Sequence, residues 1–507
     1  MLAAVLLIAG CAVAPPKPER AADTMRHEEV FAAGFNSIVE KYIDPVAIDD
    51  IALGGLQGFA SIDPALRVRR AGGRVIMEYD GDRIAEAPAP ATDAPRGWAK
   101  LTASFSSTAR HSSSLMGKAS DEKIYEAVFD GVLSDLDVFS RYAGAEEARR
   151  NRARREGFGG IGIRFKLKNG DPVITEVMPE TPAARAGLKV GDVIVRVGET
   201  NVRKFKLKQI VAKLRGPTHS KVHVRLYRAT EDRHVEAVME RLHIVPPTVK
   251  ASIEAGVLYI KVSSFNQATA RGVAAELEKA KTDAAGTLRG VVLDLRGNPG
   301  GLLKQSVKMA DLLLTHGHIV STRGRHPDSL HHYEAGGRDL ADGKPVVVLV
   351  DGKSASASEI VAAALQDRER AVLIGTSSFG KGTVQTVIRL PNNGEITLTW
   401  SRLMAPSGYA LHGIGVRPEI CTSGTPKNLK AEVRKILAAR LQTKKTFASW
   451  RSTSFREKSA RKELRKTCPS ARHKTDLDLQ MARILLDDEQ LFSQALDLSS
   501  TTVQARK

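Results

Sequence analysis

The chain has 507 residues, enough for about three domains with their own hydrophobic cores. An apolar content of 42% argues against wholesale disorder, and no run of about 20 apolar residues predicts a membrane-spanning helix. The net charge of +19 is concentrated in residues 427–474, which hold 16 Lys and Arg residues but only three acids. No aromatic-interleaved module accompanies this charge, so we expect no nucleic-acid partner and interpret the segment as a solvated basic face. Contact with an anionic membrane or an acidic partner is the second interpretation.

Residues 1–24 have the pattern of an export signal followed by a tether. A short apolar run ends in IAGC at Cys11, which resembles a bacterial lipoprotein signal, whose cysteine carries the lipid. No Lys or Arg precedes the run, and the alternative is an ordinary secretory signal. We therefore expect a protein of the bacterial cell envelope, in the periplasm, with a lipid on Cys11 as its membrane anchor. Residues 15–23 are rich in Pro and Ala and predict the tether.

Residues 25–156 predict a mainly helical N-terminal domain. Apolar side chains recur at helical spacing over residues 27–42 and again over residues 122–136. Between these helices, alternating residues around an Asp-Gly pair predict a β-hairpin over residues 74–87. The Ser-rich stretch 104–114 is expected to be exposed.

Residues 157–245 change to short alternating strands that begin with the glycine-rich sequence GFGGIGI. Backbone N–H groups of such a turn can face an anion, and the strand that follows can pair with an extended peptide. Together with the later segment LKVGDVIVRVGE, this stretch resembles a PDZ domain of the bacterial protease type. The resemblance implies that a peptide tail is held by four loop residues, Gly160, Ile161, Gly162 and Ile163. It also implies that Arg215, at the end of the PDZ helix, links ligand binding to assembly of the catalytic site.

Residues 246–420 alternate buried strands with helices. Near-continuous Val and Leu runs, such as residues 345–351, predict an α/β core whose sheet is covered on both faces. The segments AVLIG and ITLTWSRLMAP are expected to complete this sheet. The fold class is therefore α/β multidomain, with a helical N-terminal region and an inserted β-domain.

A serine cluster, SASAS, lies where strand 345–351 meets a helix. A serine hydroxyl needs a base to act as a nucleophile, and no histidine lies in this segment or in a GxSxG-type arrangement. Lys381, in the sequence FGKGTVQ, is the available base, because packing between glycines and distance from acids favour its neutral form. We predict Ser356 as the nucleophile and Lys381 as its base, with Gln385 orienting the amine without adding charge.

Backbone groups near Ser356 predict an oxyanion hole. The N–H of Ala357 lies at a helix N-terminus, where donors are unpaired. A second donor is expected from Gly300 or Gly301, in the turn after strand 290–296, because glycine lets the backbone approach a substrate carbonyl.

Three other polar groups receive structural interpretations. Asp294 and Arg296 lie two residues apart on one strand and are expected to pair with each other. Ser358 is expected to cap the following helix. The pair His331–His332 lies in a segment predicted as a polar loop with no metal-ligand spacing, so we expect no metal and no cofactor.

Residues 421–507 predict a basic insertion, residues 422–467, followed by one amphipathic helix over residues 477–492. Cys421 and Cys468 flank the insertion and remain as a pair if Cys11 is acylated. An oxidising periplasm would allow a disulfide between them, although the sequence does not establish that they are close.

The segments SASASEIVAAAL, TSSFGKGTVQ and LDLRGNPGG, preceded by the PDZ-like stretch, together resemble the C-terminal processing peptidases, or tail-specific proteases. The resemblance covers about residues 30–420 and the last helix, whereas the insertions near residues 60–120 and 422–467 depart from it. It implies a ClpP/crotonase-like α/β protease core. It also implies a triad of Ser356, Lys381 and Gln385, with Ala357 and Gly300 or Gly301 as oxyanion donors.

We therefore expect an exported serine endopeptidase that captures the C-terminal tails of envelope proteins and cleaves them through an acyl-enzyme. Its partners would be proteins with accessible tails, together with a second copy of the chain or an adaptor protein. One alternative is a non-catalytic PDZ scaffold or ligand carrier on the same fold. The other is a crotonase-like acyl enzyme, which should lack the PDZ domain and bind acyl-CoA.

Overall fold

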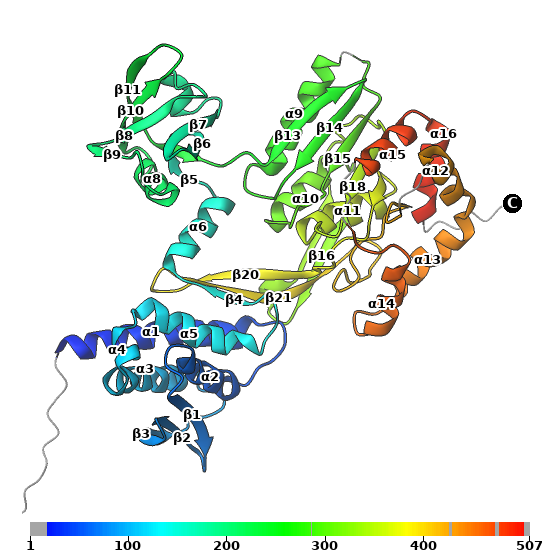
Figure 1. Ribbon diagram of the computed structural model, residues 1–507. Coiled ribbons are helices and arrows are strands. Elements are labelled where there is room, and N and C mark those ends of the chain that lie inside the picture. The colour runs from blue at the N-terminus through cyan, green and yellow to red at the C-terminus, as the bar shows by residue number, and fades with distance from the viewer. Residues whose placement is uncertain (1–17, 285, 425–427, 472–475, 501–507) are drawn as a thin grey trace, which may run out of the picture. The chain divides into compact units, whose positions relative to one another are not determined.

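A computed structural model of the chain describes residues 18–284, 286–424, 428–471 and 476–500 (Figure 1). The predicted lipidation site, Cys11, lies outside these residues. The chain divides into two compact units. The first comprises the chain up to Arg149 together with Gly324–Ser329 and Gln385–Ser401, and the second comprises the remainder. Among the described residues, no helix has both the length and the apolar sequence needed to cross a bilayer.

The first unit is mainly helical. Its elements are α1 (Pro18–Lys41), α2 (Ile48–Gln57), β1 (Leu66–Ala71), β2 (Arg74–Tyr79), β3 (Asp82–Pro88), α3 (Pro95–Ser112), α4 (Ser114–Lys118), α5 (Asp121–Ser134) and β4 (Arg141–Ala143). Phe31, Phe35, Trp98 and Phe129 are among the large side chains buried in its core. Helix α1 begins inside the stretch predicted as a tether, so that prediction is wrong from Pro18 onward. Proline is tolerated in the first turn of a helix, and the alanines that follow favour helix.

The hairpin prediction is confirmed, whereas the exposed Ser-rich stretch is a wrong prediction. Strands β2 and β3 pair antiparallel around Asp80 and Gly81, which both have positive φ. Residues of the Ser-rich stretch instead belong to helix α3, where the side chain of Ser106 is buried. The hydroxyls of Thr102 and Ser106 donate to carbonyl oxygens four residues earlier, at 2.8 Å each. These bonds satisfy the hydroxyls inside the helix, so burying them leaves no polar group unpaired.

The PDZ-like stretch forms a separate sheet with strand order β11-β10-β8-β7-β6. Its elements, preceded by α6 (Ala145–Arg155), are β5 (Phe158–Gly160), β6 (Ile163–Lys168), β7 (Asp171–Val177), α7 (Pro182–Arg185), β8 (Val193–Val197), β9 (Thr200–Asn201), α8 (Leu207–Leu214), β10 (Lys221–Arg228), β11 (Arg233–Glu240) and β12 (Leu242–Ile244). Strand β6 lies at the sheet edge, as the peptide-pairing interpretation requires.

The central sheet has six strands in the order β13-β14-β15-β18-β19-β22, parallel from β14 onward. Its strands and the helices between them are β13 (Val249–Glu254), β14 (Val257–Val262), α9 (Thr269–Asp283), β15 (Gly290–Asp294), α10 (Leu303–Asp311), β18 (Val346–Val350), α11 (Ala357–Asp367), β19 (Val372–Gly375) and β22 (Ile420–Cys421). Along β18, Val346, Val348 and Val350 pack with residues of α9, α10 and α11. Val347 and Leu349 pack on the other side with the C-terminal helices. The prediction of a sheet covered on both faces is confirmed.

The segment ITLTWSRLMAP does not complete this sheet. It forms β21 (Glu395–Met404) in a second sheet, ordered β17-β16-β21-β20, with β16 (Gly317–Gly324), β17 (His331–Ala335) and β20 (Thr383–Arg389). The place beside β19 is taken by β22, where Ile374 pairs with Ile420. The loop predicted at His331–His332 is also wrong, because both residues pair with β16.

The C-terminal segment is helical and covers one face of the central sheet. It contains α12 (Leu429–Ala438), α13 (Arg440–Ser452), α14 (Lys458–Lys466), α15 (Leu477–Leu486) and α16 (Glu489–Leu496). The single helix predicted over residues 477–492 is two helices. The side chain of Asp488 caps the second one by accepting the N–H of Leu491, which starts a new helix there. Cys421 and Cys468 form a disulfide.

Arg296 joins the end of β15 to helix α15. Its guanidinium contacts Asp294 at 2.9 Å and Asp478 at 3.1 Å, so the predicted Asp294–Arg296 pair is confirmed. Burial acts to raise the pKa of Asp294, but Arg296 and Lys261 outweigh it and hold the pKa below its usual value. The ionised form of Asp294 therefore stabilises the folded chain.

We expect Asp294→Asn to lower the free energy of unfolding by roughly 2 kcal/mol at pH 7, because Arg296 loses its bidentate carboxylate. A lowered pKa stabilises the fold above the unfolded value, about 3.9, and this contribution is lost as the pH falls through the folded pKa. The gap between wild type and variant should therefore narrow from pH 7 to pH 3. Thermal unfolding at both pH values measures this difference in the free energy of unfolding. An equal difference at pH 7 and pH 3 would show that the charge of Asp294 does not cause the loss of stability.

Candidate active site

Ser356 lies in the turn that joins β18 to α11, here called the nucleophile turn (Asp351–Ala357). Its backbone has φ 55° and ψ −110°, a conformation that residues other than glycine rarely adopt. Such strain costs about 1–3 kcal/mol and persists where surrounding bonds fix the chain. Here the N–H of Ala355 donates to the carbonyl oxygen of Asn298, and the hydroxyl of Ser354 donates to the carbonyl oxygen of Leu295. A sharp turn from strand to helix is the geometry that presents a nucleophilic serine.

Ser358 does not cap helix α11, contrary to the prediction. Helix α11 begins at Ala357, so Ser356 is its N-cap residue and Ser358 lies in the first turn. The buried hydroxyl of Ser358 donates to the carbonyl oxygen of Asn298 at 3.0 Å. It therefore ties the first turn of α11 to the glycine-rich turn after β15.

Glu359 is a buried carboxylate that the sequence analysis did not assign to the site. Its Oε2 accepts the N–H of Ser356 at 2.7 Å and the N–H of Lys381 at 2.9 Å. Its Oε1 accepts the N–H of Gly380 at 2.6 Å and the hydroxyl of Ser378 at 2.5 Å. Burial raises the pKa of Glu359, and these hydrogen bonds oppose that rise. The S-x-x-E spacing of a capping box was the signal that could have drawn attention to it.

Lys381 lies in the segment between β19 and β20, here called the lysine loop (Thr376–Gly382). A side chain at Gly382 would collide with the backbone of His412, whose nitrogen lies 1.9 Å from the Cβ position. Glycine there lets the lysine loop pack against its neighbour, and the Lys381 side chain remains half-buried. Because one oxygen of Glu359 binds both backbones, the structure brings the predicted nucleophile and base segments together.

The predicted oxyanion donors also lie beside Ser356. A Cβ at Gly300 would lie 3.0 Å from the nitrogen of Ala357, so the two backbones are in contact. The N–H of Gly300 donates to Oδ1 of Asn298 at 2.9 Å, which makes it the weaker candidate. In the described part of the chain, neither Ala357 nor Gly301 uses its N–H in a hydrogen bond. Ala357 and Gly301 are therefore the pair of donors that we favour.

Gln385 belongs to the first unit and lies on β20. Its Nε2 donates to Oγ1 of Thr399 at 3.3 Å, and that hydroxyl donates to Oδ1 of Asp137 at 3.1 Å. Its role beside Lys381 stays a prediction.

The PDZ-like sheet carries a small groove at its edge. A cavity of about 70 Å³ is lined by Phe158, Gly160, Ile161, Gly162, Ile163, Phe165, Val211, Leu214 and Arg215. Hydrogen bonds from described residues reach the carbonyl oxygens of Ile161 and Gly162, whereas the N–H groups of these two residues form none. The guanidinium of Arg215 lies 3.6 Å from the ring centroid of Phe158. All five residues predicted to bind the peptide therefore line one groove.

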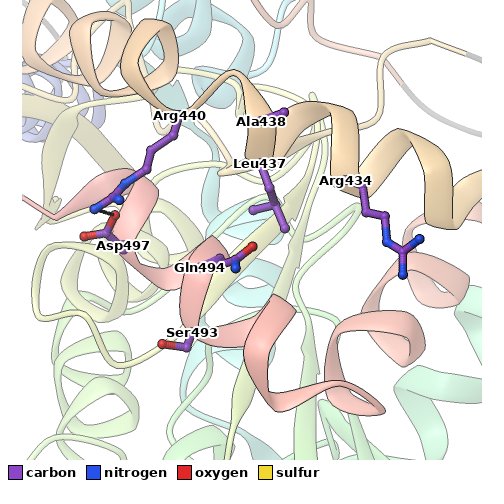
Figure 2. A pocket seen from close by; sticks show the side chains of 7 residues that line it. All are labelled: Arg434, Leu437, Ala438, Arg440, Ser493, Gln494 and Asp497. Carbon is purple, nitrogen blue, oxygen red and sulfur yellow. Dashed lines mark ion pairs between the residues drawn. The ribbon is translucent and has the colours of Figure 1, made fainter.

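A second cavity, of about 620 Å³, lies between α12, α13 and α16 (Figure 2). It is lined by Arg434, Leu437, Ala438, Arg440, Ser493, Gln494 and Asp497. Arg440 pairs with Asp497, and Figure 2 shows Arg434 pointing away from that pair. This cavity contains none of the predicted site residues. The described residues also contain no group of three or more His, Cys, Asp or Glu side chains suited to a metal ion.

Comparisons with known proteins point to one family of proteases. Residues 256–422 match the model of peptidase family S41, and residues 173–228 match that of the PDZ domain. A carboxy-terminal-processing protease of Bartonella bacilliformis is 40% identical over 305 residues, which cover 59% of this chain and 70% of that protein. A CtpA-like serine protease of Staphylococcus aureus is 32% identical over 314 residues, covering 61% of this chain and 62% of that protein.

Among solved structures, a photosystem II D1 C-terminal processing protease is similar over 78% of this chain and 92% of its own, with 23% identity and a TM-score of 0.39. The predicted resemblance and the predicted enzyme class are both confirmed by the family match and the Bartonella relative. The PDZ match argues against the crotonase-like alternative, which should lack that domain. The chain is a serine protease that belongs to peptidase family S41, with the carboxy-terminal-processing proteases.

Proposed function

We propose that this protease cleaves peptide bonds with a Ser356–Lys381 dyad. The observation that carries the proposal is the Glu359 carboxylate, which binds the backbone N–H groups of both residues through one oxygen. Two segments far apart in the sequence thereby meet at one point. The other proposed parts of an acyl-transfer site are the strained backbone of Ser356, the N–H of Ala357 that follows it, and the N–H of Gly301 in the turn after β15.

In the first step, Ser356 Oγ attacks the scissile carbonyl carbon while Lys381 Nζ takes the hydroxyl proton. The carbonyl oxygen becomes an oxyanion, which the N–H groups of Ala357 and Gly301 stabilise. The C–N bond then breaks, Lys381 returns its proton to the leaving amine, and the acyl group remains on Ser356. Water attacks this ester with Lys381 as its base, which releases the acid and restores the hydroxyl.

We propose further that the substrate is a polypeptide with an accessible C-terminal tail. The free N–H groups of Ile161 and Gly162 suit a carboxylate, and edge strand β6 can pair with an extended chain. The cavity is small and lined by apolar side chains such as Phe165 and Leu214, which favours a small apolar last residue. The Cys421–Cys468 disulfide supports an oxidising compartment, so envelope proteins in the periplasm are the proposed substrates.

Amidation of the substrate's C-terminus should weaken binding about 10-fold or more, because it removes the charge that the Ile161 and Gly162 N–H groups would hold. The measurement compares cleavage and binding of one unstructured peptide with a free or an amidated C-terminus. The same peptide with an acetylated N-terminus is the matched control, because it loses charge at the other end. Equal KM values for the free and amidated peptides would rule out capture of the tail carboxylate.

A further inference from the structure

Part of the basic C-terminal segment contacts the lysine loop directly. We call Lys458–Ala471, which contains α14, the strap. Arg465 of the strap donates from Nη2 to the carbonyl oxygen of Ser378 at 2.9 Å and from Nη1 to that of Ile414 at 2.6 Å. The same Nη2 donates to Ser470 Oγ at 2.6 Å, and this hydroxyl donates to the carbonyl oxygen of Ser377 at 2.8 Å. One guanidinium therefore connects the strap to the lysine loop and to the segment beside it.

A second arginine of the strap, Arg461, binds the segment that pairs with the lysine loop. Arg461 is buried, and its Nη1 donates to the carbonyl oxygen of His412 at 2.7 Å. The next residue, Gly413, donates its N–H to the carbonyl oxygen of Gly380 at 2.8 Å. The interpretation of the basic segment as a solvated face is therefore wrong for Arg461 and Arg465. Backbone carbonyl groups, and not acids, accept hydrogen bonds from both guanidinium groups, a match that composition does not reveal.

The strap is anchored at its C-terminal end. Cys468 forms the disulfide with Cys421, whose strand β22 lies beside β19, the strand that leads into the lysine loop. Three residues later, the N–H of Ala471 donates to Oγ1 of Thr376 at 3.1 Å, and Thr376 donates back to its carbonyl oxygen. The disulfide therefore fixes the strap close to the first residue of the lysine loop.

The lysine loop is thus held from two sides. Glu359 accepts the N–H groups of Gly380 and Lys381, whereas the strap donates to the carbonyl oxygens of Ser377 and Ser378. The residues that match the peptidase family end at position 422, so the strap lies beyond them. It lies outside the matched protease core and contacts the loop that carries the proposed base.

We propose that Arg465 is a positioning residue for Lys381 and that the Cys421–Cys468 disulfide holds the strap in place for it. The inference rests on the proposed Ser–Lys mechanism and adds a role for residues outside the matched core. Opening the disulfide frees Cys468 from the sheet edge. The hydrogen bonds of Ser470 and Arg465 to the lysine loop then weaken. A dithiol reductant achieves this by transferring two electrons and two protons: the S–S bond becomes two thiols, and the dithiol closes to a cyclic disulfide.

The first test measures kcat and KM of Arg465→Met on an unstructured peptide. Lys462→Met is the matched control, because Lys462 is exposed on the same helix. We expect kcat to fall about tenfold or more in Arg465→Met with KM within twofold, since small displacements of a catalytic group are costly. Arg465→Lys should recover only part of kcat, because an ammonium cannot span the three acceptors that the planar fork reaches. A kcat of Arg465→Met within twofold of Lys462→Met would overturn the proposal.

The second test uses the disulfide of the full chain and does not depend on how the Arg465 variants fold. Treatment of the wild type with dithiothreitol should lower kcat severalfold with little change in KM, and reoxidation should restore it. The double variant Cys421→Ser/Cys468→Ser should start at the low kcat and not respond to the reductant. A reduced wild type that keeps its full kcat would overturn the proposal.

The rate at which a fluorophosphonate labels Ser356 separates this proposal from the mechanism on which it rests. If the Ser–Lys mechanism fails, either wild-type Ser356 is not labelled or Lys381→Ala is labelled as fast as the wild type. If only the strap proposal fails, the oxidised wild type, the reduced wild type and Arg465→Met are labelled at equal rates. Slower labelling after reduction and in Arg465→Met is the expected result.

Discussion

Ser356→Ala and Lys381→Ala are each expected to lower kcat by about 10⁴-fold or more, because members of a nucleophile–base pair act as a unit. Without the Ser356 hydroxyl no acyl-enzyme forms, and without the Lys381 amine the hydroxyl keeps its proton. The double variant should be hardly slower than either single variant. Turnover of an unstructured peptide measures the loss.

Matched controls exist for both substitutions. Lys353→Ala removes an exposed lysine from the nucleophile turn, and Ser252→Ala removes an exposed serine from β13. Both controls should keep kcat within about twofold, as surface substitutions usually do little. If Lys381→Ala kept a tenth of the wild-type kcat, another group would have to be the base.

Glu359→Gln is expected to lower kcat by about 10²-fold, with a much smaller effect on KM. The carboxylate offers acceptors on both sides, and an amide has only one oxygen. In either orientation, the amide NH₂ faces at least one backbone N–H, that of Gly380 or those of Ser356 and Lys381. Two donors in contact leave buried groups unpaired, which costs about 1–3 kcal/mol each and shifts both catalytic segments.

The control for Glu359→Gln is Glu369→Gln, which changes an exposed acid just beyond the same helix. The measurement pairs kcat and KM with the thermal unfolding midpoint of each variant. KM should stay close to that of the wild type, because the proposed tail groove lies on the PDZ-like sheet. A Glu359→Gln enzyme with a kcat within threefold of the control would show that the shared carboxylate does not position the dyad.

The central sheet was predictable because its signal is local. The run Val346–Val350 has no polar member, and such a run requires cover on both faces wherever it lies in the sheet. The assignment of β21 was wrong because strand pairing is decided by partners remote in sequence. Both sheets offered an edge, and β22 occupied the one beside β19. Composition also gave a wrong prediction for the Ser-rich stretch. The hydroxyl of Ser106, like that of Thr102 just before the stretch, bonds to a carbonyl oxygen of the preceding helical turn and needs no water.

The catalytic segments were predictable to a similar degree. Ser356 and Lys381 follow from motif and chemistry, since a serine without a nearby histidine needs another base. Glu359 was missed because an acid in the first turn of a helix has an ordinary local explanation. Its bonds to the lysine loop span 21 and 22 residues. The contact of Arg465 with Ser378 spans 87 residues, and no property of a basic run indicates which carbonyl groups it will meet.

The measurement that tests the Ser–Lys dyad most directly is covalent labelling with a fluorophosphonate, followed by peptide mapping. We expect one adduct, on the peptide that contains Ser356, with labelling absent in Ser356→Ala and strongly slowed in Lys381→Ala. An adduct on another serine, or equal labelling rates in the wild type and Lys381→Ala, would contradict it.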